Sequence, residues 1–487
     1  MLRDIEKVHF VGIGGIGVSG LAEILLNLGY RVSGSDLKSS NITDRLERLG
    51  ATVYEGHVAD HIEDAAIVVI SAAVPDDNPE VVAARERGIP VVQRSQMLAD
   101  LMRLKPSAIA VAGTHGKTTA SSMIAAVLEQ AEMESTAIIG GILNRTNSNV
   151  AWGRGDLLVA EADEHDGSFL RLFPTNCVVT NIDPEHLDYY GTLDAIKLAF
   201  LDFINRIPFY GFAVLCSDDR NVRDLLPEVQ STRITYGLGS DAEVRAENIQ
   251  VCVPNPPGSH PVSVIDEVTT CFSVVNNRKN LAPLGTLGDL SVRAVGDHNV
   301  RNALAAVTTG LALGMTFEQV REGLASFRGV RRRLQVKGRS DGIVVLEDYA
   351  HHPTEIAATL DAVRAVKPGR IIAVFQPHLY SRTKYFCSEF ADVLLDTDRL
   401  IVTEIYRARE KPMPGVTALD IVRMARDMGH GAADYVADKN EVIDIIEREG
   451  LETGDVVLFL GAGDIWRVTD EMARRIESPQ NHDIEET

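Results

Sequence analysis

The chain has 487 residues, 45% of them hydrophobic, and a mean hydropathy near zero, which predicts a globular enzyme of about three domains. Its formal net charge of −21 argues against nucleic-acid binding, and no apolar run reaches the roughly 18–20 residues that a membrane helix needs. Five scattered cysteines without a CxxC pair, and a first segment unlike a signal peptide, indicate a reducing cytoplasm and argue against a disulfide framework or a zinc site.

Residues 1–105 alternate short apolar runs with helical patterns such as GLAEILLNLG. Strands that alternate with helices predict a parallel sheet, here in a Rossmann-like α/β domain. The strands expected in this segment are VHFVGIG, YRVSGSD, AIVVISAAV and IPVVQRS.

The loop after the first strand carries the dinucleotide pattern G-x-G-x-x-G at Gly12, Gly14 and Gly17. Small residues there permit a tight turn, and the amides at the following helix N-terminus face an anion. Asp36 follows the second strand, where a ribose-binding carboxylate is expected. Taken alone the loop favours NAD or FAD, and its plain alternative is a tight strand–helix turn.

Residues 106–327 form the second segment, a P-loop type α/β domain that opens with IAVAGTHGKTTASS. The Walker pattern is incomplete, because Val111 stands where the first glycine belongs. Backbone donors, an ammonium for the phosphates and a hydroxyl for Mg²⁺ are nevertheless all present. The alternative without function is a glycine-rich turn with a surface lysine. The loop residues expected to contact ATP are Gly113, Thr114, His115, Gly116, Lys117, Thr118 and Thr119.

Carboxylates and a histidine follow two further strands of this segment. Glu161 ends an apolar run, and Asp163, Glu164 and Asp166 follow it, but four carboxylates cannot all bind one Mg²⁺, which usually keeps several waters. His186 in TNIDPEHLDYYG could bind a metal or contact phosphates, although a lone histidine is more often structural.

The remainder divides into an insertion and a third segment. Residues 240–295 suggest β-hairpins and loops in an antiparallel appendage. Residues 328–487 form the third segment, a second Rossmann-like α/β domain with a polar tail from residue 477 that we expect to be disordered. Its expected strands are GIVVLEDYAHHP, GRIIAVFQPH, RLIVTEIY and VVLFLGAGD.

Nine motifs over residues 7–470 resemble the Mur ligase family, in the order in which that family carries them. They are GIGGIGVSGLAE, GTHGKTT, EADEHDGSF, TNIDPEHLDYY, GDHNVRNALAAV, GVRRRLQ, DYAHHPTEI, QPHLYSRT and GAGDIW. The resemblance implies three α/β domains. It also implies ATP- and Mg²⁺-dependent joining of L-alanine to the lactyl carboxylate of UDP-N-acetylmuramate, through an acyl phosphate, in peptidoglycan precursor synthesis. GIGGIGVSGLAE, DYAHHP and QPHLYSRT point to the alanine-adding branch.

In this family the first glycine loop binds a UDP-sugar instead of NAD, since a pyrophosphate is common to both. The resemblance assigns catalysis to Lys117, Glu161 and His186, a first Mg²⁺ to Thr118 and Glu161, and a second to His186. UDP-sugar residues are Gly12, Gly14, Gly15, Gly17, Asp36 and Ser71. Other nucleotide contacts are His298, Asn299 and Asn302 near adenine, where a helix cap by Asp297 or Asn299 is the plain alternative, together with Asp348 and Arg332 or Arg333. The alanine site is assigned to Tyr349, His351, His378 and Arg382, whose guanidinium suits a carboxylate.

The chain departs from sister ligases that use a carbamylated lysine near the metals. Phe200 stands at that place and Lys197 lies three residues away, so no carbamylation is expected. The base that deprotonates the alanine amine is left open between His186 and His351, and the oligomeric state between monomer and homodimer.

Three alternatives remain open at this stage. The chain could be a ligase for a recycled peptide or a folate, although the folate ligases lack an extra N-terminal domain and the peptide ligases lack the GIGGIG loop. It could be an NAD-dependent oxidoreductase fused to a P-loop module. It could also be a nucleotide-binding regulator without enzyme activity.

Overall fold

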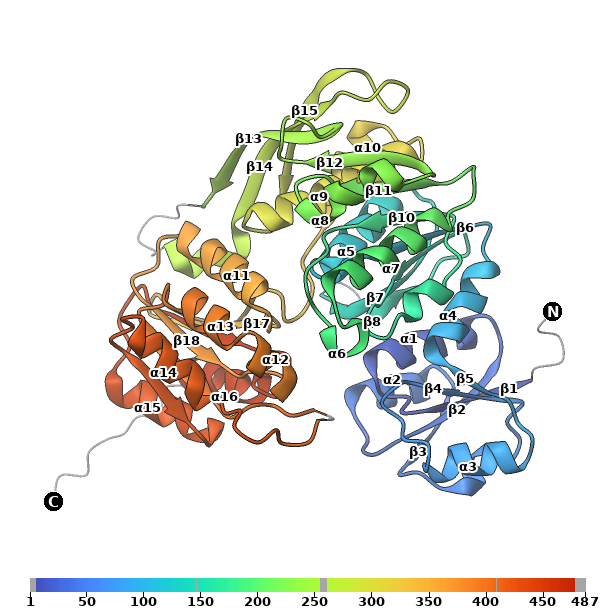
Figure 1. Ribbon diagram of the computed structural model, residues 1–487, viewed down its shortest axis with the longest axis horizontal. Coiled ribbons are helices and arrows are strands. Elements are labelled where there is room, and N and C mark those ends of the chain that lie inside the picture. The colour runs from blue at the N-terminus through green and yellow to red at the C-terminus, as the bar shows by residue number, and fades with distance from the viewer. Residues whose placement is uncertain (1–5, 145–147, 255–260, 409, 478–487) are drawn as a thin grey trace. The chain divides into compact units, whose positions relative to one another are not determined.

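The computed structural model describes residues 6–144, 148–254, 261–408 and 410–477, and it contains three sheets (Figure 1). Each predicted segment contains one sheet, and the domain boundaries at residues 105 and 327 stay predictions. Contacts divide the chain into two compact units, unit 1 (residues 1–248, 272–291 and 301–330) and unit 2 (residues 249–271, 292–300 and 331–487). Within the described ranges, no helix is long and apolar enough to cross a membrane. The expectation of disorder in the polar tail falls almost wholly on residues 478–487, outside the described chain.

The first sheet is parallel throughout and has the order β3-β2-β1-β4-β5, as the alternating pattern predicts. Its strands are β1 (Lys7–Val11), β2 (Arg31–Asp36), β3 (Thr52–Glu55), β4 (Ile67–Ile70) and β5 (Val91–Gln93). Its helices are α1 (Ile16–Asn27), α2 (Asn41–Arg48), η1 (Ala59–Ile62) and α3 (Pro79–Glu86). The strand order reverses between β1 and β4, and open α/β sheets bind ligands at the carboxyl ends of strands beside such a reversal.

A fully buried carboxylate, Glu80 of α3, joins several elements of this domain. Its Oε1 atom accepts a hydrogen bond from His61 Nδ1 at 2.8 Å, and its Oε2 atom lies 2.5 Å from Ser35 Oγ and 3.1 Å from His57 Nδ1. The Nε2 atom of buried His9 lies 3.6 Å from Oε1. Burial would raise the pKa of Glu80, but these partners hold it well below the ordinary value of 4.5, at about 2.

We expect the substitution Glu80→Gln to destabilise the protein by about 2–3 kcal/mol at pH 7, because the depressed pKa reports stabilisation of the ionised form. A carboxyl group whose pKa is lower in the folded state stabilises the fold at pH values above its pKa in the unfolded state. The loss of stability in Glu80→Gln is therefore expected to shrink as pH falls from 4.5 towards 2. Urea unfolding of the wild-type protein and of Glu80→Gln, at pH 7 and at pH 3, measures this difference in the free energy of unfolding. The exposed Glu47→Gln variant is the matched control, and a deficit independent of pH would contradict the assignment.

The central sheet has ten strands in the order β15-β14-β13-β12-β11-β10-β6-β9-β7-β8. β6 lies between β10 and β9 and is parallel to both, which places the P-loop at the middle of the sheet. The strands are β6 (Ser107–Ala112), β7 (Thr136–Leu143), β8 (Ser148–Ala151), β9 (Leu157–Glu161), β10 (Asn176–Val179), β11 (Phe212–Cys216), β12 (Thr232–Gly237), β13 (Val244–Cys252), β14 (Thr269–Asn276) and β15 (Gly285–Val292). The helices are α4 (Arg94–Arg103), α5 (Lys117–Gln130), η2 (Ser168–Arg171), α6 (Leu187–Tyr190), α7 (Leu193–Asn205), α8 (Arg220–Leu225), η3 (Leu226–Glu228), η4 (Pro261–Glu267), α9 (Asp297–Ala312) and α10 (Phe317–Ser326).

Residues 240–295, where β-hairpins and loops in an antiparallel appendage are predicted, contain three strands that are successive neighbours at one end of the central sheet. Strands β13, β14 and β15 continue the central sheet, and β13 pairs with β12 in parallel. The hairpin-like pattern identified strands, but a local pattern cannot show that their edge joins a sheet formed earlier in the chain. Residues 255–260 of this stretch lie outside the described ranges.

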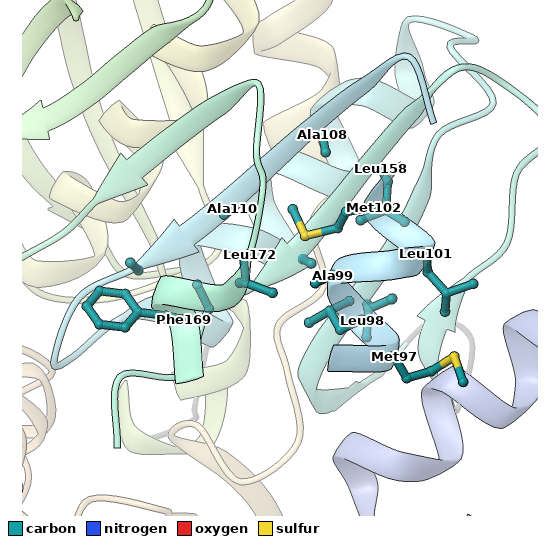
Figure 2. Close-up of a cluster of buried hydrophobic side chains, with 14 of the residues drawn as sticks. Met97, Leu98, Ala99, Leu101, Met102, Ala108, Ala110, Leu158, Phe169 and Leu172 are labelled. Carbon is teal, nitrogen blue, oxygen red and sulfur yellow. The ribbon is translucent and has the colours of Figure 1, made fainter. Parts of the chain in front are cut away.

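Helix α4 packs its apolar side chains against the central sheet (Figure 2). Met102 and Leu98 belong to the same buried cluster as Ala108 of β6, Leu158 of β9 and Phe169 of η2. Because α4 directly follows β5 of the first sheet, this cluster links the first two segments within unit 1.

The third sheet has the order β16-β17-β21-β18-β19-β20 and is parallel apart from the antiparallel edge strand β16. Alternate residues of β21 are buried in two different cores. One core contains Val456, Leu458 and Leu460, and the other contains Val457 and Phe459. Burial on both faces explains the unbroken apolar run of this strand. The strands are β16 (Gln335–Ser340), β17 (Ile343–Asp348), β18 (Ile371–Phe375), β19 (Arg399–Thr403), β20 (Ala433–Val436) and β21 (Val456–Leu460). The helices are α11 (Pro353–Ala365), α12 (Tyr380–Tyr385), α13 (Cys387–Leu394), α14 (Leu419–Asp427), η5 (Lys439–Glu441), α15 (Val442–Glu449) and α16 (Trp466–Glu477).

Candidate active site

The first glycine loop forms a tight turn between β1 and α1. The amide of Gly12 donates to Ser35 O at 2.8 Å, and the amide of Gly14 donates to Asp36 Oδ2 at 2.8 Å. A Cβ atom on Gly14 would lie 2.9 Å from that carboxylate oxygen, so the close approach requires glycine. Asp36 therefore holds the loop, in addition to any contact it makes with a ribose.

The other predicted residues of this site lie on either side of the strand reversal. Gly15 precedes α1 directly, so the first amides of that helix open towards the loop. Gly17 lies against the guanidinium of Arg94, and the same guanidinium lies 3.5 Å from Asp163 of the acidic loop after β9. Ser71 follows β4, on the far side of the reversal from the glycines. Sequence reasoning missed Arg94, which connects the first loop to the acidic loop.

The P-loop runs from β6 into α5. Gly116, the residue before α5, has φ = +81°, a left-handed conformation that favours glycine. The buried side chain of Asn302 lies beside it, because a Cβ atom on Gly116 would come 2.6 Å from Asn302 Oδ1. The structure thus brings Asn302 of α9 to the loop from nearly two hundred residues away.

Lys117 is held in a buried ion pair that sequence reasoning did not assign. Its Nζ atom donates to Gly113 O at 2.6 Å, to Thr114 O at 3.2 Å and to both carboxylate oxygens of Glu164 at 2.7 and 2.9 Å. Burial would lower the pKa of Lys117, but the carboxylates of Glu164, Asp163 and Glu161 raise it. Burial raises the pKa of Glu164 to about 7, against the lowering effect of Lys117, whose ammonium contacts both carboxylate oxygens and favours the ionised pair.

Two oxygen-bearing groups, the hydroxyl of Thr118 and the carboxylate of Glu161, meet beside the Lys117–Glu164 pair. Thr118 Oγ1 lies 3.1 and 3.0 Å from the two carboxylate oxygens of Glu161, at the end of β9. The amide of Gly140 donates to Glu161 Oε2 at 2.7 Å and fixes the carboxylate. A hydroxyl and a carboxylate are hard oxygen ligands of the kind that Mg²⁺ takes, with water completing the shell, so these side chains fit the metal.

The segment after β10 supports the P-loop from the other side. Asn181 Oδ1 accepts a hydrogen bond from the amide of His115 at 2.8 Å, and His115 Nε2 lies 3.0 Å from Asp183 Oδ2. Thr114 Oγ1 accepts from the amide of Asp183 at 2.9 Å. Asn181 and Asp183 were not predicted, although they stand in the same motif as His186. Thr119 lies in the first turn of α5.

His186 lies at the start of α6 with φ = +55°, and its ring centroid lies 4.5 Å from that of His165. Burial lowers the pKa of His186 to about 4, and the charges of His165 and Lys117 act in the same direction, against the carboxylates of Glu185 and Asp163. The imidazole is therefore neutral at pH 7, which is the form that binds metals.

Helix α9 carries the predicted adenine-side residues. The amide of Asn299 donates to Gly296 O at 2.9 Å, and its side-chain amide donates to Val295 O at 2.8 Å. The side chain of Asn299 is thus engaged with the backbone that precedes the helix. The ring of His298, which is half-buried, packs against Gly296.

Arg332 and Asp348 are both engaged with their own unit. Arg332 Nε donates to buried Glu347 Oε1 at 2.6 Å, and Nη2 donates to Gly461 O at 2.8 Å. Asp348 accepts from the amides of Leu334 at 2.6 Å and Ala350 at 2.8 Å. Burial raises the pKa of Asp348 to about 6, against the lowering effect of Arg333 and the two amides. The sequence motif contained Glu347, but no pattern marked it as the partner of Arg332.

The residues predicted for the amino acid form an aromatic and basic cluster in unit 2, at the carboxyl ends of β17 and β18. The ring of Tyr349 contacts that of His351, with centroids 5.3 Å apart, and His351 lies 5.8 Å from His378. His378 stacks on Tyr406, which was not predicted, with centroids 5.7 Å apart. Arg382 is buried, and its Nη1 donates to His378 O at 3.1 Å. A guanidinium offers paired donors that suit a small carboxylate, and this one lies beside the ring of His378.

Three family profiles match successive parts of the chain. They are described as "Mur ligase family, catalytic domain" at residues 7–106, "Mur ligase middle domain" at residues 111–310, and "Mur ligase, glutamate ligase domain" at residues 332–463.

Curated relatives are similar over the full length. The UDP-N-acetylmuramate–L-alanine ligase of Trichlorobacter lovleyi is 47% identical over 478 residues, covering 98% of this chain and 100% of that protein. The ligase of the same name from Geobacter sulfurreducens is 48% identical over 479 residues, covering 98% and 99%. Among solved structures, UDP-N-acetylmuramate-alanine ligase from Thermotoga maritima gives a TM-score of 0.80 at 30% identity, covering 97% and 100%. A murein peptide ligase from Psychrobacter arcticus, at 23% identity and a TM-score of 0.69, shares the fold.

Proposed function

This chain belongs to the Mur ligase family, and from that premise we propose that it joins L-alanine to the lactyl carboxylate of UDP-N-acetylmuramate, with hydrolysis of ATP to ADP and phosphate. The observation that carries the proposal is 47–48% identity, over nearly the whole length of both chains, to ligases named for these two substrates. A cytoplasmic location follows from the proposal, because its substrates are cytoplasmic metabolites. The three domains of this enzyme would be residues 1–105, 106–327 and 328–487.

In the first step the lactyl carboxylate attacks the γ-phosphorus of ATP, an acyl phosphate forms, and ADP leaves. Lys117 would pair with the phosphoryl oxygens, over which negative charge spreads in the transition state. Thr118 and Glu161 would hold one Mg²⁺ and His186 a second, and the metal would supply Lewis-acid neutralisation of the phosphates. The amides of the first glycine loop would bind the pyrophosphate of the UDP-sugar.

In the second step the amine of L-alanine attacks the acyl carbon, and phosphate leaves from the tetrahedral intermediate. Arg382 and His378 would bind the alanine carboxylate. Tyr349 and His351 would form the wall of the pocket for the alanine methyl group. Such a wall excludes larger side chains, whereas rejection of glycine through one missing methyl is worth only about 1–3 kcal/mol.

Phosphate release by the purified protein tests the proposal, with Mg²⁺, ATP, UDP-N-acetylmuramate and L-alanine each present or omitted. We expect release only when all four are present, together with an alanyl product identified by mass. Replacing L-alanine by a murein tripeptide distinguishes the peptide-recycling alternative. Tight NADH binding without phosphate release would instead support the oxidoreductase alternative and overturn the proposal.

We expect Glu161→Gln to raise the Mg²⁺ concentration for half-maximal phosphate release by about tenfold or more, because the substitution removes a charged metal ligand. Asp166→Asn is the matched control, since Asp166 Oδ1 accepts a hydrogen bond from the amide of Ser168 at 3.0 Å within the same loop. A Mg²⁺ titration of both variants measures the difference. An equal rise in the half-maximal Mg²⁺ concentration for both variants would show that Glu161 affects metal binding only by holding the loop in shape.

A further inference from the structure

Two cysteines that are far apart in sequence meet on neighbouring strands of the central sheet. Cys252 ends β13 and Cys271 lies in β14, and their Sγ atoms are 3.0 Å apart across a separation of 19 residues. Cys252 is exposed and Cys271 is half-buried, and both are in the reduced form. β13 and β14 are adjacent in the sheet (Figure 1), so the contact comes from strand pairing.

The surroundings of the pair do not resemble those of a thiol that attacks a substrate. Reactive thiolates are usually stabilised by a nearby cation, but in the described part of the chain no cation lowers the pKa of Cys252. The hydrogen bond to Cys271 raises the pKa of Cys252 above its ordinary value. The reaction that this geometry favours is therefore the one that joins the two sulfurs to each other.

The chain between the two cysteines is anchored at its far side. Val262, Ile265 and Val268, in and just after η4, are buried in a core of unit 2. Arg339 donates to Ser263 O at 2.5 Å and to Asp266 at 2.8 Å. A bond between the two sulfurs would close the loop at its base, while these contacts already hold its other end.

We propose that Cys252 and Cys271 form a reversible intramolecular disulfide when they meet a small-molecule disulfide. The thiolate of one cysteine attacks the small disulfide, forms a mixed disulfide and releases one thiol. The thiolate of the other then attacks the protein sulfur and releases the second thiol, so the two protons and two electrons leave with the small molecule. A dithiol reductant reverses the reaction.

The other three cysteines lack these conditions. Cys177 and Cys216 are fully buried, and burial raises the pKa of both thiols, to about 11 for Cys216. Cys387 is half-buried, and burial raises its pKa as well. Oxidation of the native protein is therefore expected to be selective for the pair.

The test treats the full-length protein with oxidised glutathione, then alkylates it after denaturation. The titre of thiols is expected to fall from five to three, and dithiothreitol is expected to restore it. Cleavage after Glu267 separates the two cysteines, so a disulfide-linked pair of peptides identifies the bond. Cys387→Ser is the matched control that keeps the link, and Cys252→Ser and Cys271→Ser are expected to lose it. Glutathione adducts on both cysteines, or a disulfide between two chains, would overturn the proposal.

Discussion

Replacing Lys117 by methionine is expected to lower the rate of phosphate release by about a thousandfold or more, because no other residue of the loop 113–119 carries an ammonium that could pair with the phosphoryl oxygens. Binding of UDP-N-acetylmuramate, measured by calorimetry, is expected to change by less than about threefold, since the proposed site for that substrate is the first glycine loop. Methionine keeps the length of the side chain and removes its charge. A loss of UDP-sugar binding in the folded variant would contradict this division between the two loops.

A second variant is needed because Lys117 forms an ion pair with Glu164. The substitution Lys117→Met alone leaves this buried carboxylate without its cation and lowers stability for that reason. The double variant Lys117→Met with Glu164→Gln removes both charges, so it separates loss of the ammonium from the cost of the unpaired carboxylate. We expect the double variant to regain stability but not activity. Lys197→Met is the matched control, since Lys197 pairs with Asp224 on the surface at 2.8 Å.

Replacing Gly14 by valine is expected to have the opposite selectivity, weakening UDP-N-acetylmuramate binding by about a hundredfold and ATP binding by less than about threefold. The new Cβ atom would lie 2.9 Å from Asp36 Oδ2 and 3.2 Å from Thr43 Cγ2, so the loop must shift and its amides lose their alignment. Calorimetry with the UDP-sugar and with a non-hydrolysable ATP analogue measures both affinities.

Gly431→Val serves as the control for this substitution, because no atom lies within 4 Å of a Cβ atom at Gly431. It is expected to leave both affinities unchanged. Equal weakening of ATP and UDP-sugar in the Gly14 variant would mean that the first loop supports the whole of unit 1, and not one substrate.

The parts of the fold that could be predicted are those that depend on local pattern. The parallel first sheet and the strands of the third segment follow from apolar runs buried on both faces. The same patterns placed the glycine loop after β1, Lys117 after β6 and Glu161 at the end of β9, where parallel strands present their carboxyl ends. In the first and third sheets, strands β3, β16 and β20 were not identified from the sequence, because they are short or polar and lack such runs. In the central sheet, no strand was predicted for β7, β8, β11 or β12.

The parts that could not be predicted depend on choices among chemically similar residues. Four carboxylates lie within residues 161–166, at the end of β9 and in the loop after it, and only the local conformation decides that Glu164 pairs with Lys117 while Glu161 meets Thr118. The pairing of Arg332 with Glu347 depends in the same way on the backbone at β16 and β17. Likewise, nothing in the spacing of 19 residues indicated that Cys252 and Cys271 touch.

The Lys117–Glu164 pair has a consequence for the form in which the nucleotide arrives. Because the Lys117 ammonium is matched by the Glu164 carboxylate, and Asp163 and Glu161 lie close by, the P-loop presents no net positive charge to an anion. The whole chain is acidic as well, at −21. Under the proposed function, free ATP would meet repulsion here, whereas Mg²⁺ bound to the nucleotide would offset the charge of Glu161, so that Lys117 could exchange Glu164 for the phosphoryl oxygens. The proposed ATP site is therefore expected to favour the metal-bound nucleotide over the free one.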